Sequence, residues 1–150
     1  MNQNFSFIKE LEEKNKKRKV HFFKWDQKYS VKNKIIDEQH RKLFLLVDEL
    51  YFFPFEKQKK GHLKKILIEL ISYCKYHFAT EERLFEIKKY KFLEQHKKEH
   101  KHFIQRINNF YNDFIEGKEI HISEFIKFMK EWLKNHVMVN DMKYVDVLKD

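Results

Sequence analysis

Glycine and proline are almost absent from this chain, whose 150 residues include two glycines and one proline. All-β folds need many tight turns, and turns depend on Gly, Pro, Asn and Asp for their backbone conformations. Hydrophobic residues make up 42% of the chain, which is enough to build a packed core, and the length suits one domain. We therefore predict an all-α fold.

Four stretches of the chain place apolar residues at helical spacing. The predicted helices begin near Asp37, Gly61, Phe92 and Ser123 and end near Pro54, Leu84, Gly117 and Tyr144. Four amphipathic helices with short connections form an up-down-up-down bundle. Residues 24–36 have no sustained period and are predicted to be a loop. Residues 1–20 are predicted to be an N-terminal arm or short helix, ahead of a domain spanning 21–150.

The charge balance excludes few functions but favours an ordinary soluble domain. Lys and Arg number 32 and Asp and Glu 23, a formal net charge of +9. The lysines are scattered as the solvated faces of helices, so we expect neither nucleic acid nor a membrane as a partner. The polar N-terminus lacks a secretory apolar segment, and we expect a cytoplasmic protein. The single Cys74 excludes an intrachain disulfide and a Cys-rich zinc site.

Groups that can bind a metal interrupt each apolar stripe. They are His40, His77, Glu81, His96, His100 and His136. Residues four apart on a helix point the same way, so His77 aligns with Glu81 and His96 with His100. A lone inward histidine is best explained by a backbone hydrogen bond. Five of them with a carboxylate are better explained by one shared cation, because each buried polar group costs a few kcal/mol if unpartnered.

The size of this ligand set favours two metal ions. Five imidazoles and a carboxylate exceed the four ligands of a tetrahedral zinc site, and imidazole also suits iron, copper and nickel. Two metals with bridging carboxylates would use the set efficiently, and Asp141 is the candidate second carboxylate. Five residues of ideal helix separate His136 and Asp141 by about 140°. The two side chains therefore either flank the centre or are brought together by a π-bulge.

Five stretches in order resemble the hemerythrins, specifically the bacterial single-domain kind (bacteriohemerythrins). They are WD and YSV within 25–31, IDEQH at 36–40, Tyr73 through HFATEE at 77–82, HKKEH at 96–100, and WLKNH at 132–136 continuing to DMKY at 141–144. H-x-x-x-H alone occurs by chance in many helices, whereas five matches in order are specific. Two family positions differ here: Lys32-Asn33-Lys34 replaces the usual glycine, and Asp48 replaces an asparagine.

The resemblance implies a non-haem di-iron centre with an oxo or hydroxo bridge that binds O2 reversibly. It implies that His96, His100 and His136 bind one iron, that His40 and His77 bind the other, and that Glu81 and Asp141 bridge both. It also implies an apolar lining for the O2 pocket, made by Leu43, Phe78, Trp132, Leu133 and Val137. The remaining histidines, His21, His62, His102 and His121, match no ligand and are expected on the surface.

We expect an oxygen carrier, store or local supplier rather than an enzyme. The first alternative is an O2 or redox sensor that acts through a separate partner protein, which the sequence does not identify. The second is a di-iron enzyme that removes peroxide. Enzymatic di-iron bundles of the ferritin type are rich in Glu, with a Glu-x-x-His motif on two helices. The histidine-rich set found here argues against that chemistry.

Overall fold

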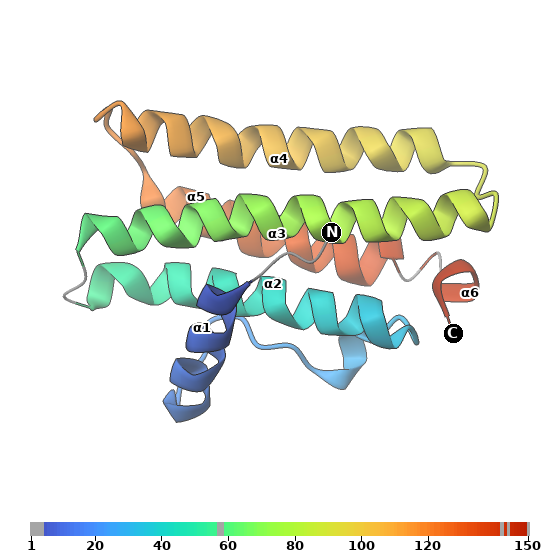
Figure 1. Ribbon diagram of the computed structural model, residues 1–150, viewed down its shortest axis with the longest axis horizontal. Helices are drawn as coiled ribbons and strands as arrows, with labels where there is room; N and C mark the ends of the chain where they lie inside the picture. Colours follow the sequence, from blue (N-terminus) through green and yellow to red (C-terminus); the bar gives the residue numbers. More distant parts are fainter. Residues whose placement is uncertain (1–4, 57–58, 142, 144, 150) are drawn as a thin grey trace.

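The molecule is a bundle of four long helices that run along a common axis (Figure 1). The computed structural model describes residues 5–56, 59–141, 143 and 145–149, with the backbone alone for 139–141. The bundle helices are α2 (Lys34–Phe52), α3 (Lys60–Ile87), α4 (Leu93–Ile115) and α5 (Ile122–Asn135). Consecutive helices run in opposite directions (Figure 1), which confirms the predicted all-α up-down-up-down architecture.

Shorter elements surround the bundle. They are α1 (Ser6–Lys17), η1 (Gln27–Tyr29), η2 (Phe53–Phe55), η3 (His136–Asp141) and α6 (Val145–Leu148). The helix α1 crosses the bundle steeply beside α2, whereas α6 lies at the end of the bundle where α5 stops (Figure 1). None of the helices in the described ranges is long and apolar enough to cross a bilayer.

The first bundle helix begins earlier than predicted. Asn33 is its N-cap, and the Asn33 side chain accepts a hydrogen bond from the amide of Ile36 (3.0 Å). The predicted cap at Asp37 was wrong, because that carboxylate instead accepts from the amide of Val31 (2.8 Å) and holds the preceding loop. Lys32 has a left-handed backbone with φ +60°. This conformation favours glycine, the residue usual at this position in the family that the sequence resembles.

The other helix ends follow the turn signals with two exceptions. Gly117 closes α4 with φ +73°, as predicted, and Lys118 donates its amide to the carbonyl of Asp113 (2.9 Å). Phe92 was predicted to face inward, but it precedes α4 and is 48% exposed. The fourth helix was predicted to continue to Tyr144, which lies outside the described residues; α5 gives way at His136 to the π-helix η3.

The core is built from apolar residues of all four bundle helices. Its fully buried members include Leu43, Leu46, Leu50, Ile66, Leu67, Leu70, Phe103, Ile107, Met129 and Leu133. Stacked rings join the last two helices, with Phe103 against Trp132 (3.8 Å between centroids) and Phe110 against Phe125 (3.9 Å). Cys74 is buried in this core.

The N-terminal helix α1 packs against this core and adds charged contacts. Ile8 and Leu11 are buried. Lys14 Nζ lies 2.6 Å from a Glu49 oxygen, and Arg18 Nη2 lies 3.2 Å from the other Glu49 oxygen. The predicted division into an arm, 1–20, and a domain, 21–150, stays a prediction.

Asp48 anchors the segment that follows α1. The carboxylate is fully buried and accepts hydrogen bonds from the amides of Phe22 (2.6 Å) and Phe23 (2.9 Å) and from Asn15 Nδ2 (3.1 Å). His21 Nδ1 lies 3.0 Å from the same carboxylate. Asp48 therefore anchors the N-terminal segment from inside the fold. A carboxylate accepts from more donors at once than an amide oxygen does.

Two of the four histidines expected on the surface are not there. His21 is half-buried beside Asp48, and His62 is half-buried with Nε2 2.9 Å from Glu49 Oε1. His102 and His121 are exposed, as expected. His21 and His62 contact carboxylates of another element, and the spacing of residues within one helix does not reveal such contacts.

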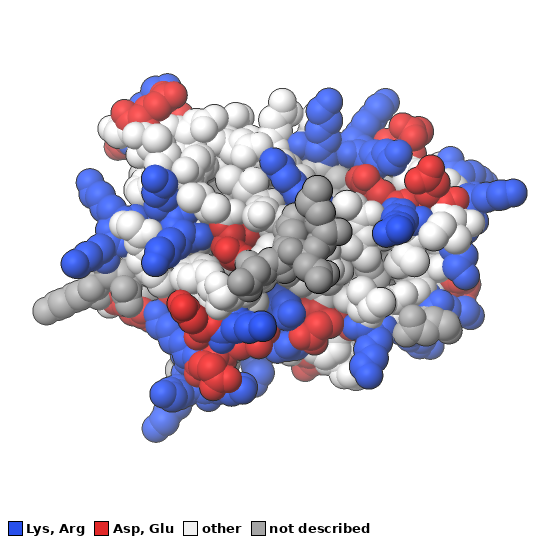
Figure 2. Space-filling view, in the orientation of Figure 1, with Lys and Arg blue, Asp and Glu red and all other residues white. Residues whose placement is uncertain are grey.

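Positive and negative side chains alternate over the face shown in Figure 2, with Lys and Arg distributed across it rather than gathered in one groove. Among the described residues, several of these charges are paired locally along helices, as in Lys16 with Glu13 (2.9 Å) and Lys97 with Glu94 (3.7 Å). Exposed pairs of this kind contribute little to stability.

We predict that Asp48→Ala lowers the free energy of unfolding by about 3 kcal/mol, because it leaves several buried donors without an acceptor. Urea denaturation followed by circular dichroism measures this. Asp113→Ala removes an exposed carboxylate on α4 and should change stability by less than about 0.5 kcal/mol. Equal stability of the two variants would show that Asp48 does not anchor the N-terminal segment.

Candidate metal centre

Five histidines and one glutamate meet at one end of the bundle. In an up-down-up-down bundle the beginnings of α2 and α4 lie at the same end as the last turns of α3 and α5 (Figure 1). The cluster comes from these four places, and no member is more than 2% exposed: His40, His77, Glu81, His96, His100 and His136. The polar interruptions of the four apolar stripes therefore converge in space, as the sequence predicted.

The Glu81 carboxylate lies at the middle of the cluster, and its two oxygens face different imidazoles. The Oε2 atom lies 3.1 Å from His77 Nε2, 3.4 Å from His136 Nε2 and 3.9 Å from His40 Nε2. The Oε1 atom contacts His96 Nε2 and lies 3.4 Å from His100 Nε2. A carboxylate placed in this way has one oxygen available to each of two neighbouring cations.

Two groups of potential ligand atoms lie close enough to surround a cation. Within each group the ligand atoms lie within 4.8 Å of one another. The first is formed by His40, His77, Glu81 and His136, and the second by Glu81, His96, His100 and His136. Glu81 and His136 belong to both groups, so the two sites are adjacent rather than separate.

The residues fit a cation because some of their buried atoms have no hydrogen bond. Within the described part of the chain, His77 Nε2, His100 Nε2 and Glu81 Oε2 are buried and make none. A buried polar atom left in this state costs about 1–3 kcal/mol. All three atoms face the centre of the cluster, where a bound cation would satisfy them together. The donor set of imidazole and carboxylate is one that iron, zinc and copper accept.

Two of the imidazoles accept support from side chains outside the cluster, and these contacts fix the direction of the ring nitrogens that face its centre. His77 Nδ1 lies 2.8 Å from Gln39 Oε1, and His100 Nδ1 lies 2.9 Å from Glu82 Oε1. Since these oxygens accept, each Nδ1 donates the hydrogen bond, and the Nε2 atom is directed at the centre, where it is the nitrogen available to a cation. Thr80 extends the first contact through its hydroxyl, 3.3 Å from Gln39 Nε2.

The sequence prediction did not include Gln39 and Glu82 in the site. Each is adjacent in the chain to a predicted ligand, His40 or Glu81, so helical phase alone places it off the inward line. The available signal was their position inside the matching stretches IDEQH and HFATEE.

The backbone between His136 and Asp141 is a π-helix. A π-helix pairs residues five apart. This confirms the π-bulge, one of the two ways the sequence left open for these residues to approach one centre. The Asp141 side chain lies outside the described part of the structure, so its place as a ligand stays a prediction.

Comparison with known proteins identifies the family. Residues 31–148 match the model of the hemerythrin HHE cation binding domain. The chain belongs to the hemerythrin family. The match begins at the loop held by Asp37 and includes every residue of the cluster.

Related hemerythrins cover most of the chain. A bacteriohemerythrin of Clostridium acetobutylicum is 32% identical over 128 residues, covering 83% of this chain and 99% of that protein. A hemerythrin-like protein of Naegleria gruberi is 35% identical over 126 residues, covering 84% and 93%. A crystal structure of wild-type hemerythrin superimposes with a TM-score of 0.79 at 25% identity, covering 86% of this chain and 99% of that one.

Aromatic rings cover the hemerythrin cluster on the side of α4 and α5. Phe78 stacks on His100, with ring centroids 3.8 Å apart and planes at 5°. Trp132 lies between His136 (4.9 Å, 13°) and Phe103 (3.8 Å, 9°), nearly parallel to both. These rings hold two of the imidazoles from the outer side.

The five predicted lining residues belong to the core or pack against it, and their role as the lining of an O2 pocket stays a prediction. Phe78, Leu43, Leu133 and Val137 are buried, and Trp132 is half-buried. Leu43 follows His40 by three residues, and Leu133 precedes His136 by three, so each shares a helix face with a member of the cluster.

The pKa values show which imidazoles are ready to bind a cation. Burial lowers the pKa of His77 to about 4 and that of His136 to about 3, so both are neutral at pH 7. Burial also opposes the charge on His100, but contacts with Glu81 and Glu82 outweigh it and raise its pKa to about 9. Burial disfavours ionised Glu81, yet the surrounding imidazoles, His136 first, hold the pKa of Glu81 well below its usual range.

We predict that Zn²⁺ binding to the metal-free protein at pH 7 releases about one more proton from the natural chain than from a His100→Gln variant. With a pKa of about 9, His100 carries an extra proton at pH 7, and a metal-bound imidazole must give that proton up. A pH indicator in weakly buffered solution measures the release during titration. Equal release by the two proteins would contradict the protonation assigned to His100.

Proposed function

We propose that this hemerythrin binds O2 reversibly at a non-haem di-iron centre and acts as an oxygen carrier, store or local supplier. The observation that carries the proposal is the Glu81 carboxylate, whose two oxygens face two different sets of buried imidazoles. Such a carboxylate bridges two cations. The histidine-rich surroundings favour iron in a site built for binding, whereas ferritin-type enzymes rely on Glu.

Seven side chains would hold the two irons. We assign His40 and His77 to one iron, His96, His100 and His136 to the other, and Glu81 and Asp141 as bridges. The contacts of Glu81 Oε1 with His96 and His100 support two members of the second set, and the 3.1 Å contact of Oε2 with His77 supports the first. His136 lies 3.4 Å from Oε2 and belongs to both groups of ligand atoms, so its assignment to the second iron rests on the family resemblance. When bound, the iron pair would supply the two electrons that O2 takes up and returns.

The unequal share of imidazoles gives O2 a place to bind. In this assignment three histidines would hold one iron and two would hold the other, so the second iron would have fewer protein ligands. His40 and His77 approach from α2 and α3, and their ring centroids are 4.6 Å apart. Gln39 holds the His77 ring from outside, which keeps its Nε2 directed at the metal.

The surrounding side chains keep water and protons away from bound oxygen. The proposed lining, Leu43, Phe78, Trp132, Leu133 and Val137, carries no ionisable group. A dry apolar wall slows the protonation that releases reduced oxygen and leaves the irons oxidised. A wall without a general acid also gives no help to cleavage of the O–O bond, which favours carriage over oxidation.

The other two functions use the same centre and differ in what they require. A sensor needs a partner protein that reads the oxygenated form. A peroxide-removing enzyme needs repeated turnover, with a proton supply that the apolar wall does not offer. We therefore favour carriage, and the decisive difference is whether O2 returns unchanged.

Reversible uptake tests the proposal directly. Iron-loaded, reduced protein is mixed with O2 while its visible spectrum is recorded, and the O2 is then removed under argon. The account expects one O2 bound per two irons and recovery of the reduced spectrum over repeated cycles. Irreversible oxidation at the first exposure would contradict it, and so would catalytic consumption of added hydrogen peroxide.

We predict that His77→Ala abolishes O2 binding, because it removes one of only two imidazoles from the proposed O2-binding iron. The matched control is His102→Ala on the exposed face of α4; His62 is unsuitable because it contacts Glu49. Oxygen uptake and iron content per chain are measured for both variants. If both bind O2 alike, the assignment of His77 is wrong.

We predict that Leu133→Ala speeds irreversible oxidation of the irons several-fold, because a cavity in the apolar wall admits water. Truncating a buried leucine costs about 2–5 kcal/mol of stability, so the control must carry the same penalty. Leu63→Ala provides it, since Leu63 is buried near the start of α3, at the other end of the bundle. Equal oxidation rates in the two folded, iron-loaded variants would remove Leu133 from the pocket.

A further inference from the structure

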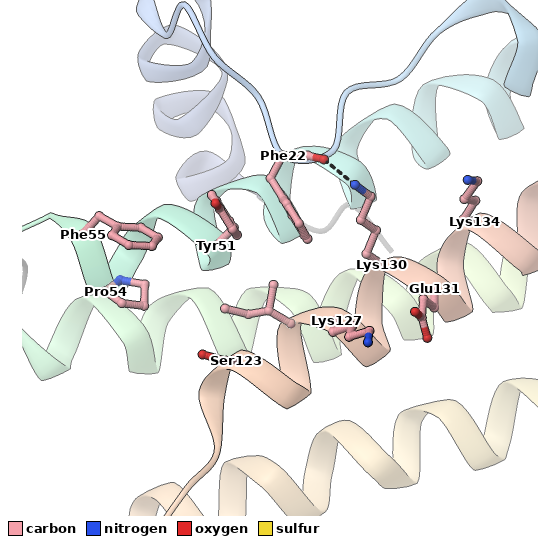
Figure 3. A pocket seen from close by; sticks show the side chains of 10 residues that line it. Phe22, Tyr51, Pro54, Phe55, Ser123, Lys127, Lys130, Glu131 and Lys134 are labelled. Carbon is pink, nitrogen blue, oxygen red and sulfur yellow. Dashed lines mark hydrogen bonds between the residues drawn. The ribbon is translucent and has the colours of Figure 1, made fainter.

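A cavity lies between α2 and α5, apart from the metal cluster. Its volume is about 690 Å³, within the range of small-molecule sites. Figure 3 looks into it, with Phe22 of the segment between α1 and η1 and the end of α2 on one side and α5 on the other. The lining residues are Phe22, Tyr51, Pro54, Phe55, Ser123, Ile126, Lys127, Lys130, Glu131 and Lys134.

One end of this pocket is apolar and aromatic. Phe22 and Tyr51 stack face to face, with centroids 4.1 Å apart and planes at 4°, and the Tyr51 ring lies 5.5 Å from that of Phe55. Pro54 completes this end (Figure 3), and Ile126 lies on the α5 side. Phe55 is 73% exposed. An exposed phenylalanine beside a preformed apolar hollow is typical of a surface that receives a ligand.

The other end of the pocket is positively charged. Lys130 and Lys134 lie four residues apart and direct their ammonium groups to the same side of α5, whereas the ammonium group of Lys127 lies on the other side (Figure 3). Within the part of the chain that the structure describes, none of these three ammonium groups makes an ion pair with a carboxylate. The one acidic lining residue, Glu131, directs its carboxylate away from the ammonium groups of Lys130 and Lys134 and to the side of Lys127 (Figure 3).

Lys130 is held in place beside the apolar rings. Its Nζ donates to the carbonyl of Phe22 (2.8 Å) and lies 4.1 Å from the centroid of the Phe22 ring. These contacts leave the ammonium with donor capacity for a further acceptor, because it carries three N–H groups. A positioned cation next to an apolar surface matches a ligand that has a carboxylate at the end of an apolar body.

We propose that this pocket binds a small amphipathic carboxylate, with the carboxylate at Lys130, on the side of α5 that Lys134 shares, and the apolar body along Phe22, Tyr51 and Phe55. The positive charge of the pocket disfavours a cationic amphiphile. A short anion such as acetate has no apolar chain to pack against the aromatic end. The size favours a free molecule with a chain of about ten to twelve carbons over a protein helix, which needs a longer groove. The site is independent of the irons.

Calorimetric titration of the iron-loaded protein with dodecanoate, below its micelle concentration, tests the proposal. We expect one dodecanoate per chain, and binding at least about tenfold weaker for dodecanol, dodecyltrimethylammonium and acetate, each of which lacks one of the two recognised features. Equal affinity for dodecanol and dodecanoate would overturn the proposal. Binding to phosphatidylglycerol vesicles without binding to dodecanoate would overturn it in favour of a lipid surface.

Two variants locate the site. Lys130→Gln with Lys134→Gln should weaken dodecanoate binding about tenfold or more, whereas Lys64→Gln with Lys65→Gln, an equal change of charge on exposed α3, should not. Ser123→Trp fills the pocket from an exposed position and should abolish binding with the melting temperature unchanged. Equal affinity of both lysine pairs would overturn the proposal, and so would a folded Ser123→Trp variant that binds like the natural chain.

Discussion

The structure depends on one buried carboxylate, Glu81, surrounded by five imidazoles. An ionised carboxylate in a bundle core is costly unless groups of opposite charge or hydrogen-bond donors surround it. Here its oxygens face His77 at 3.1 Å and His100 at 3.4 Å from different sides. Bound cations would satisfy the carboxylate and the imidazoles together. The four helices are thereby committed to one register, since each contributes at least one member to the same point.

The bundle topology makes this convergence possible. Alternating helix directions bring the starts of α2 and α4 to the ends of α3 and α5. The second condition is local: the backbone from His136 to Asp141, directly after α5, is a π-helix, which changes the angular spacing of the side chains that follow His136. The third is the outer support of the rings, in which Gln39 and Phe78 hold His77 and His100 from behind. The first condition concerns the topology, the second the local backbone conformation, and the third the contacts of side chains.

Features that depend on the spacing of residues within one helix could be predicted from the sequence. Features that depend on contacts between distant segments could be predicted only in part. The inward histidines were predictable because a polar residue on an apolar stripe is visible at helical spacing. The burial of Asp48 could not be predicted because its donors, the amides of Phe22 and Phe23, come from a segment without regular spacing. The helix start was misplaced at Asp37 because Asn33 and Asp37, four residues apart, both have side chains suited to capping.

The central claim, that Glu81 bridges two irons, is tested most directly by Mössbauer spectroscopy of the protein loaded with ⁵⁷Fe and oxidised. Two ferric ions joined by a bridge couple magnetically, whereas separate ions behave as independent paramagnets. The account predicts two irons per chain with a coupled, diamagnetic ground state, and loss of that coupled signal in Glu81→Ala. One iron per chain, or two uncoupled ferric ions in the natural protein, would contradict it.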